Sequence, residues 1–421
     1  MTRILFFGDA AHTGFGTVTW DLCTRMLANG DDLRILSMNQ TADPIPAPLG
    51  ERTWDLSRGG VDVLQLLNTG FRDGWKPEVA IILGDYQAVR GYVIETDPAL
   101  TRAFASVPTL HYCPVEGIDL PPRWAKLWEV VQPVAMSEFG ADQIEVVTGS
   151  RPPVVYHGVD TDTFYPITLA RPGRFQGQPI RTKEHAKAVI GLDPDRIHAL
   201  RTDRHMPRKN QNRLIRDMVA AFDAEPRLDL VLHCRMQDEG GSLHDTVSKL
   251  PREYWTRIKF TNAHDSWRGL DRSDLNVLYN AADIYVTNSA EGFGLTPAEA
   301  AACGVPVVAM DYSTMPEVVG PAGVLVPVGE LYDNQYDHYW AWPDGAAYAA
   351  AVVRLAKHKK ERQAMGARGP KHIAAMFSWD RAARQFTDLC AAASTIAAAP
   401  ALEALPSVDE LLHNGGREGQ S

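Results

Sequence analysis

Short apolar runs alternate with longer segments of helical spacing along most of this chain, and this alternation restricts the folds that it can adopt. The first series of apolar runs lies at residues 3–7, 33–38, 79–83, 108–112 and 133–136. The segment between the first two runs places Val18, Leu22 and Met26 on one helical face and ends at Gly30. Strands that alternate with helices form a parallel sheet, because each helix carries the chain back to the same end of the sheet. We therefore predict that the first part of the chain is an α/β unit.

A second series of the same kind follows a stretch that is rich in proline and glycine. This stretch, FYPITLARPGRFQGQP, has the composition of a linker. Apolar runs then recur at residues 196–202, 228–234, 283–289 and 305–310. The 421 residues also exceed what one hydrophobic core usually serves. We predict an N-terminal Rossmann-like domain over residues 1–165, a linker over 166–195 and a C-terminal Rossmann-like domain over 196–376.

Two further helical patterns close the chain, at residues 344–369 and 379–399. The second of these is rich in alanine. We expect residues 377–399 to form a C-terminal helix. The polar, glycine-containing residues 400–421 are expected to form a flexible tail.

Composition and charge disfavour several classes of protein. The formal net charge of −10 and the isoelectric point near 5.7 argue against a nucleic-acid partner, because phosphate binding needs a basic face. The five cysteines form no C-x-x-C pair, which is typical of a reduced, cytoplasmic protein. The N-terminus does not resemble a signal peptide, and we predict no transmembrane segment. A peripheral membrane contact stays open.

A glycine-rich loop follows the first predicted strand, in the sequence FFGDAAHTGFGTVTW. Gly14 and Gly16 would let the backbone approach a ligand closely. The pattern is G-x-G-x-x-T, and Asn39 stands after the second strand where a dinucleotide fold has an acidic residue. A nicotinamide cofactor is therefore disfavoured. The loop either faces a phosphate or sugar, or it is only a tight turn between strand and helix.

A basic loop, RTDRHMPRKNQNRLI, follows the first strand of the second series. It holds Arg204, Arg208 and Lys209. A loop at this position lies at the carboxyl edge of a parallel sheet, where α/β proteins bind ligands. Arginine and lysine there would suit a diphosphate, although a charge run can also be a solvated turn.

The segment EGFGLTPAEAAACG, from Glu291 to Gly304, combines two carboxylates with the expected start of a helix. Thr296 fits an N-cap and Pro297 the first helical position, so Glu299 falls where a capping box places its glutamate. Helix capping alone would explain Glu299. Glu291 lies in the glycine-rich loop before the helix, where a carboxylate suits recognition of hydroxyl groups.

These segments together resemble the retaining glycosyltransferases of family 4, which have the GT-B fold. The segment beginning AEGFGLTPAEAAACG is similar to that family's E-x7-E region, and YHGVDTDTFYP and AMSEFGADQI are similar to two segments of its first domain. RHMPRKN is similar to its GRxxxxKG loop, with Asp203 in place of the leading glycine. The resemblance covers about residues 1–390. It implies an α/β protein of two Rossmann-like domains whose parallel sheets face a cleft, with the C-terminal helix crossing back to the first domain.

The resemblance also implies roles for individual residues. Glu299 would hold the ribose hydroxyls of a nucleotide, and Glu291 would approach the donor sugar. Arg204 and Lys209 would bind the diphosphate. The donor would also contact the backbone of Phe293, Gly294 and Leu295, and Gly16 would close over the phosphates from the first domain. His111, at the end of a predicted strand, would lie near the reacting sugar or be structural.

The resulting hypothesis is an enzyme that moves a sugar from a nucleotide-diphosphate sugar to an acceptor hydroxyl, with retention of anomeric configuration. No cofactor or metal is expected, because cations and a helix N-terminus can stabilise the leaving diphosphate and no DxD signature stands at the end of a predicted strand. The acceptor could be a glycan, a protein or a small molecule. The alternatives are a GT-B epimerase or phosphorylase and a non-catalytic protein that binds sugar nucleotides or glycans.

Overall fold

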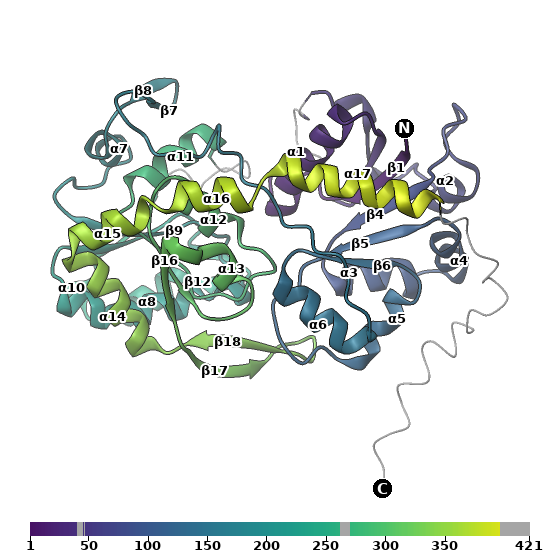
Figure 1. Cartoon of the computed structure of the whole chain (residues 1–421). Helices are drawn as coiled ribbons and strands as arrows, with labels where there is room; N and C mark the ends of the chain where they lie inside the picture. Colours follow the sequence, from purple (N-terminus) through teal and green to yellow (C-terminus); the bar gives the residue numbers. More distant parts are fainter. Residues whose placement is uncertain (40–44, 46, 262–269, 396–421) are drawn as a thin grey trace, which may run out of the picture. The chain divides into compact units, whose positions relative to one another are not determined.

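The computed structural model describes residues 1–39, 45, 47–261 and 270–395, and the chain divides into two compact units (Figure 1). Unit 1 consists of Met1–Gly158, Gln335–His338 and the described residues from Trp379 onward. Unit 2 consists of Val159–Asn334 and Tyr339–Ser378. Each unit is built on its own parallel sheet, which confirms the predicted α/β class with two Rossmann-like domains.

Unit 1 contains a six-stranded parallel sheet in the order β3-β2-β1-β4-β5-β6. Strands β4 and β5 are fully buried and β1 is buried after Arg3, as expected for strands covered by helices on both faces. The strands are β1 (Arg3–Gly8), β2 (Asp32–Ser37), β3 (Thr53–Asp55), β4 (Val79–Leu83), β5 (Thr109–Cys113) and β6 (Gln132–Ala135).

The helices of unit 1 cover this sheet. They are α1 (Gly14–Ala28), α2 (Val63–Thr69), α3 (Tyr86–Arg90), α4 (Pro98–Ser106), α5 (Ala125–Trp128), α6 (Glu138–Thr148) and α17 (Trp379–Thr395). The last helix comes from the end of the chain and packs against α1 (Figure 1). The Thr387 hydroxyl donates to the Asp31 carboxylate at 2.6 Å, and Arg25 pairs with Asp380 at 3.0 Å. Helix α17 occupies most of the range predicted for a C-terminal helix; residues 396–421, with the predicted tail, lie outside the described residues.

Unit 2 repeats the same strand order in a second parallel sheet, β13-β10-β9-β14-β15-β16. The strands are β9 (Ile197–Arg201), β10 (Leu228–Leu232), β13 (Ile258–Phe260), β14 (Ile284–Val286), β15 (Val307–Met310) and β16 (Gly323–Val326). Three two-stranded hairpins accompany the sheet: β7 (Gly173–Phe175) with β8 (Gln178–Ile180), β11 (Gln237–Asp238) with β12 (Gly241–Ser242), and β17 (Val328–Asp333) with β18 (Tyr339–Pro343).

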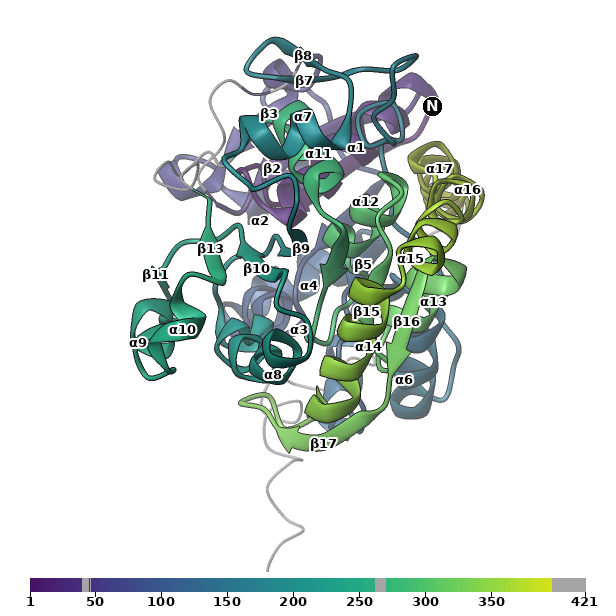
Figure 2. The same ribbon diagram turned by 90° about the vertical axis from the view of Figure 1, so that its left-hand side faces the viewer.

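Helices pack against the sheet of unit 2; α14, for example, lies beside β16 (Figure 2). They are α7 (Lys183–Val189), α8 (Gln211–Ala224), α9 (Leu243–Ser248), α10 (Arg252–Trp255), α11 (Arg272–Ala281), α12 (Leu295–Ala302), α13 (Met315–Val319), α14 (Gly345–Lys357), α15 (Lys359–Gly366) and α16 (Gly369–Met376). The long helical pattern near residue 350 is split into α14 and α15 at His358, whose backbone is not helical.

The range predicted as a linker, 166–195, carries β7, β8 and α7 and belongs to unit 2. Its backbone is tied to α11. The Asn280 side chain accepts from the Ile167 N–H at 2.8 Å, and Asp274 accepts from the Gln176 N–H at 2.8 Å. The prolines and glycines of this range therefore form turns around short strands that pack on unit 2. Composition alone does not distinguish such turns from a linker.

Candidate active site

In both sheets the first and fourth strands of the series lie side by side, and the later strands are added outward from this pair in opposite directions. This point is the strand reversal of the sheet. In unit 2 this point lies between β9 and β14, which pair side by side. Ligands of open α/β sheets bind at the carboxyl ends of the strands that flank such a reversal. The connections that leave these two ends are 202–210, with the basic loop, and 287–294, with Glu291. The fold therefore brings the two predicted motifs of unit 2 to one place.

Lys209 and Glu291 form the centre of this site. The Lys209 Nζ lies 2.6 and 2.7 Å from the two Glu291 carboxylate oxygens. Arg208 donates to the Glu291 carboxylate at 3.1 Å and to the Ala290 carbonyl oxygen at 2.6 Å. The Ser289 hydroxyl donates to the same carboxylate at 2.5 Å. Residues that are 82 positions apart in sequence, on two loops, are thus joined by charge-assisted hydrogen bonds, which are the stronger kind.

Burial alone would raise the pKa of the Glu291 carboxyl. The charges of Lys209 and Arg208, with the hydrogen bonds from Lys209 and Ser289, overcome this effect and hold the pKa well below its ordinary value of 4.5. Glu291 is therefore ionised at neutral pH. It can accept hydrogen bonds from hydroxyl groups but cannot donate a proton to a substrate.

A second, buried ion pair, between Arg201 and Asp203, also contacts the basic loop. The Arg201 Nε lies 2.6 Å from the Asp203 carboxylate, and the Arg201 Nη2 donates to the Ser289 hydroxyl at 2.8 Å. The other Asp203 oxygen lies 3.0 Å from the Lys209 Nζ. Lys209 is therefore held between two carboxylates, Asp203 and Glu291. The side chain at position 203, where the similar motif has glycine, is thus part of the arrangement that places Lys209.

Arg204 is also paired, but with a different segment. Its Nε and Nη2 atoms each lie 3.0 Å from one oxygen of Asp238, and Nη2 donates to Glu239 at 2.7 Å. About half of the Arg204 side chain is exposed. Arg204 and Lys209, the two cations predicted to bind a diphosphate, thus belong to one loop and are each held by carboxylates.

The helix after Glu291 begins earlier than the capping-box interpretation requires, so that interpretation is wrong. The N-cap of α12 is Gly294, with φ of 96°, and Thr296 lies inside the helix. Gly294 fits because it has no side chain: a Cβ would lie 2.6 Å from the Met315 side chain, and the left-handed backbone suits glycine. Among the described residues no side chain caps this helix, so its first N–H groups and its dipole are available to an anion.

Glu299 is used differently from a capping residue. It is buried, and its carboxylate accepts a hydrogen bond from the Tyr279 hydroxyl at 2.8 Å. That hydroxyl also bonds to the Thr202 hydroxyl at 3.0 Å. Glu299 thus lies on the first turns of α12, next to the strand end that begins the basic loop. Phe293, Gly294 and Leu295 provide the backbone between the two glutamates.

The two predicted residues of unit 1 have structural explanations within that unit. A Cβ at Gly16 would lie 1.8 Å from the Ala11 carbonyl oxygen, so the fold of the loop itself requires glycine. His111 is fully buried on β5; its Nε2 pairs with the Gly84 carbonyl oxygen at 3.0 Å, and the Trp128 indole donates to Nδ1 at 3.2 Å. Burial lowers the pKa of His111 to about 4, so the ring is neutral at pH 7. These contacts favour the structural interpretation of His111.

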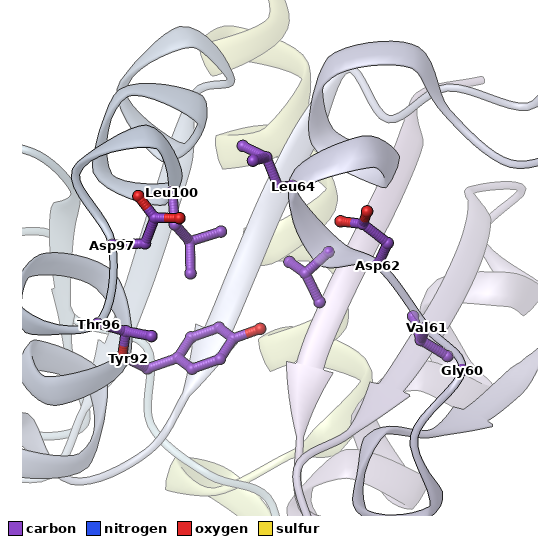
Figure 3. A pocket seen from close by; sticks show the side chains of 9 residues that line it. Gly60, Val61, Asp62, Leu64, Tyr92, Thr96, Asp97 and Leu100 are labelled. Atoms are coloured by element: carbon purple, nitrogen blue, oxygen red, sulfur yellow. The ribbon is translucent and has the colours of Figure 1, made fainter.

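A hollow of about 600 Å³ also lies in unit 1, between the start of α2 and the turn before α4 (Figure 3). Its lining includes Tyr92, Leu64, Asp62 and Asp97, and none of the predicted site residues. The two carboxylates cap helices: Asp62 accepts from the Gln65 N–H at 2.9 Å and Asp97 from the Ala99 N–H at 2.7 Å. Helix capping accounts for its acidic groups, so we do not assign this hollow to the site.

Solved structures identify the class of fold. The chain aligns over 92% of its length with 98% of a sucrose-phosphate synthase from Thermosynechococcus elongatus, at a TM-score of 0.66 and 20% identity. It aligns over 93% of its length with the whole of an Anabaena protein solved with UDP and glucose, at a TM-score of 0.65 and 16% identity. The fold is therefore that of the GT-B glycosyltransferases.

Sequence comparison finds similarity to known glycosyltransferases. Residues 198–358, most of which lie in unit 2, match the model of the family described as glycosyl transferases group 1. A GDP-mannose-dependent monoacylated alpha-(1-6)-phosphatidylinositol monomannoside mannosyltransferase of Corynebacterium glutamicum is 25% identical over 60% of this chain. A D-inositol 3-phosphate glycosyltransferase of Streptomyces bingchenggensis is 28% identical over 62% of it. The alignments cover 60% and 52% of these two relatives.

Several residues of the site were not predicted from the sequence as site residues. Arg208 was recognised only as part of a basic cluster, Asp203 only as a departure from a motif, and Ser289 and Asp238 not at all. Ser289 could have been found, because it lies two residues before Glu291 in the loop that follows the buried strand β14. Across the described ranges, no group of three or more His, Cys, Asp or Glu side chains could hold a metal ion. None of the described helices combines the length and apolar character needed to cross a bilayer.

Proposed function

We propose that this protein transfers a sugar from a nucleotide-diphosphate sugar to an acceptor hydroxyl. The observation that carries the proposal is the pairing of Lys209 with Glu291 at the strand reversal of unit 2, beside the uncapped N-terminus of α12. A cation and a helix N-terminus suit a diphosphate, and an ionised carboxylate suits sugar hydroxyls. This combination matches the two ends of a nucleotide sugar better than it matches a simple anion.

The residues would act as follows. Lys209, Arg204 and the first N–H groups of α12 bind the diphosphate and stabilise the charge that grows on it as the bond to the anomeric carbon breaks. Glu291 accepts hydrogen bonds from the sugar, and Glu299 from the ribose. The acceptor oxygen bonds to the anomeric carbon, and its proton passes to the departing diphosphate. Transfer on the face that the diphosphate leaves retains the anomeric configuration.

The cations of the site would replace a metal ion in this reaction, so we propose that transfer is metal-independent. The names of the matched proteins guide the choice of donors: one relative is GDP-mannose-dependent, and one structure was solved with UDP and glucose. The acceptor, a glycan, protein or small molecule, would bind to unit 1. We also propose a cytoplasmic location, which the five free, buried cysteines support.

The test is to incubate the purified protein with UDP- and GDP-sugars and a panel of glycan, protein and small-molecule acceptors. We expect release of nucleoside diphosphate, an acceptor mass increase of one sugar, and no loss of activity with a chelator. Lys209→Ala should abolish transfer, while Glu330→Gln, at an exposed position of the same unit, should not. Absence of nucleotide binding and of release with every donor would refute the proposal. Binding without transfer would favour a non-catalytic sugar-nucleotide-binding protein.

A further inference from the structure

One edge of the Arg204 guanidinium is fully occupied by the β11–β12 hairpin. Its Nε and Nη2 atoms face the two oxygens of Asp238 at 3.0 Å each, and Nη2 also donates to Glu239 at 2.7 Å. The Nη1 group bonds to no protein atom among the described residues. An arginine has five N–H donors in a fixed fork, so fixing one edge also fixes the direction of the remaining donors.

The carboxylate that holds Arg204 is itself fixed. Only 8% of the Asp238 side chain is exposed, although that of Arg204 is 53% exposed. Asp238 also accepts from the Glu239 N–H at 2.9 Å, which orients its carboxylate within the hairpin. Burial raises the pKa of Asp238, but the hydrogen bond and charge of Arg204 outweigh it and lower the pKa below its ordinary value, so the pair is ionised at neutral pH.

The hairpin is anchored to the loop that carries Arg204. The Gly240 N–H donates to the His205 carbonyl oxygen at 2.9 Å, and the Asn212 side chain donates to the Gly240 carbonyl oxygen at 3.0 Å. A Cβ at Gly240 would lie 2.4 Å from the His205 ring, so the two segments touch closely. The Gln211 side chain donates to the Arg204 carbonyl oxygen at 3.0 Å and so holds the loop backbone from the other side.

We propose that Asp238 is a positioning residue for the diphosphate: it holds the Arg204 guanidinium so that the Nη1 group is directed at the phosphates. This inference rests on the proposed function, because it takes Arg204 as a ligand of the diphosphate. Asp238 lies 34 residues after Arg204 and outside the motifs recognised in the sequence. Glu239, whose side chain is 55% exposed, is an auxiliary partner that contributes little.

The experiment measures the binding of UDP and of GDP to the full chain by titration calorimetry. The variants are Arg204→Ala, Asp238→Asn, the double variant of both, and Glu239→Gln as the matched control. We expect Arg204→Ala and Asp238→Asn each to weaken binding on the order of tenfold, because misplacing a binding group by about 1 Å can cost up to 100-fold. The double variant should bind no more weakly than Arg204→Ala, and Glu239→Gln should stay within about threefold of the native protein.

The double variant separates positioning from general loss of structure, because a destabilised hairpin would weaken binding further even without Arg204. If Asp238→Asn binds as tightly as the native protein or more tightly while Arg204→Ala binds weakly, Asp238 does not position Arg204 and the inference is overturned, with the proposed function intact. An Arg204→Ala variant of native affinity also overturns it. If the native protein binds neither nucleotide, both the inference and the proposed function fail.

Discussion

Replacing Glu291 by glutamine separates the contribution of this carboxylate to folding from its contribution to ligand binding. Glutamine keeps the size of the side chain and one acceptor oxygen, but it removes the charge that faces Lys209 and Arg208. In the native chain the carboxylate oxygens lie 2.6 and 2.7 Å from the Lys209 Nζ and 3.1 Å from Arg208. The substitution leaves two buried or half-buried cations with one carboxylate, Asp203, which lies 3.0 Å from the Lys209 Nζ.

These contacts determine how much stability the substitution should cost. Removing one partner of a buried ion pair costs about 3–5 kcal/mol, because it leaves a buried charge without compensation. Asp203 still compensates Lys209, and 23% of the Arg208 side chain is exposed to solvent, which screens its charge. We therefore expect Glu291→Gln to lower the unfolding free energy of unit 2 by about 2 kcal/mol at pH 7, below the full range for a buried pair.

The loss of stability in Glu291→Gln should be smaller at acidic pH than at neutral pH. The folded-state pKa of Glu291 lies below its ordinary value of 4.5, so the carboxylate stabilises the fold above that pH. This contribution disappears as the pH falls from 4.5 toward the folded-state pKa. The difference between the native protein and Glu291→Gln should therefore be full at pH 7, begin to shrink only below about pH 4.5, and be smaller at pH 3 than at pH 7. Hydrogen exchange of the amides of β9 and β14 measures it within unit 2.

Ligand binding gives the second half of this test. Removing a negative charge beside the diphosphate should let Glu291→Gln bind UDP or GDP at least as tightly as the native protein, whereas sugar transfer should fall on the order of 100-fold, as for a lost transition-state contact. Glu330→Gln is the matched control for both measurements, since Glu330 is exposed on β17. A nucleotide affinity that falls as far in Glu291→Gln as in Lys209→Ala would refute the assignment of Glu291 to the sugar. An unchanged stability at pH 7 would refute the electrostatic argument.

Four further predictions concern Glu299, its hydrogen-bond partner Tyr279, and two residues of unit 1. Glu299→Ala should weaken nucleotide binding tenfold or more without unfolding α12, because Gly294 and not Glu299 begins that helix. Tyr279→Phe removes the 2.8 Å hydrogen bond to Glu299 and should lower the free energy of unfolding, measured by urea titration, by about 1 kcal/mol. His111→Gln should lower the melting temperature while the folded protein keeps its turnover number, and a large loss of turnover at unchanged stability would restore a catalytic role. Gly16→Ala should destabilise unit 1 by about 2 kcal/mol, measured by scanning calorimetry, because a Cβ has no room beside Ala11. Gly14→Ala is the control and should be neutral in the same measurement, because nothing lies within 4 Å of a Cβ at that position.

The strands of the two six-stranded sheets that sequence analysis missed all lie at an edge of their sheet. The central strands were predicted because they are buried on both faces and so consist of unbroken apolar runs. β3 (Thr53–Asp55), β13 (Ile258–Phe260) and β16 (Gly323–Val326) are all edge strands of three or four residues with several half-buried side chains. An edge strand pairs on one side only and needs less apolar surface, so its sequence carries little signal.

The site was predictable to the extent that it follows from strand order. Glu291 and Lys209 are 82 residues apart, yet both follow strands that an α/β alternation places at one carboxyl edge. The position of Asp238 was not predictable in this way, because it lies on a two-residue strand of a small hairpin whose location depends on tertiary packing. The start of α12 was misplaced because Thr-Pro-x-Glu fits a capping box by spacing alone. The left-handed backbone of Gly294, two residues earlier, outweighed that spacing.

The pairing of Lys209, Arg208 and Arg204 with carboxylates explains how a site that we propose to bind a diphosphate can contain so many acidic groups. Lys209 is held by Asp203 and Glu291, Arg208 by Glu291, and Arg204 by Asp238. A site with unpaired cations would attract any phosphate. In this site an anion must compete with carboxylates that already pair with the cations, so a simple anion gains little binding energy. The proposed ligand also donates hydrogen bonds from its hydroxyl groups to these carboxylates. The carboxylates would thus act as a filter: they disfavour simple anions and reward a ligand that carries hydroxyls on both sides of its diphosphate.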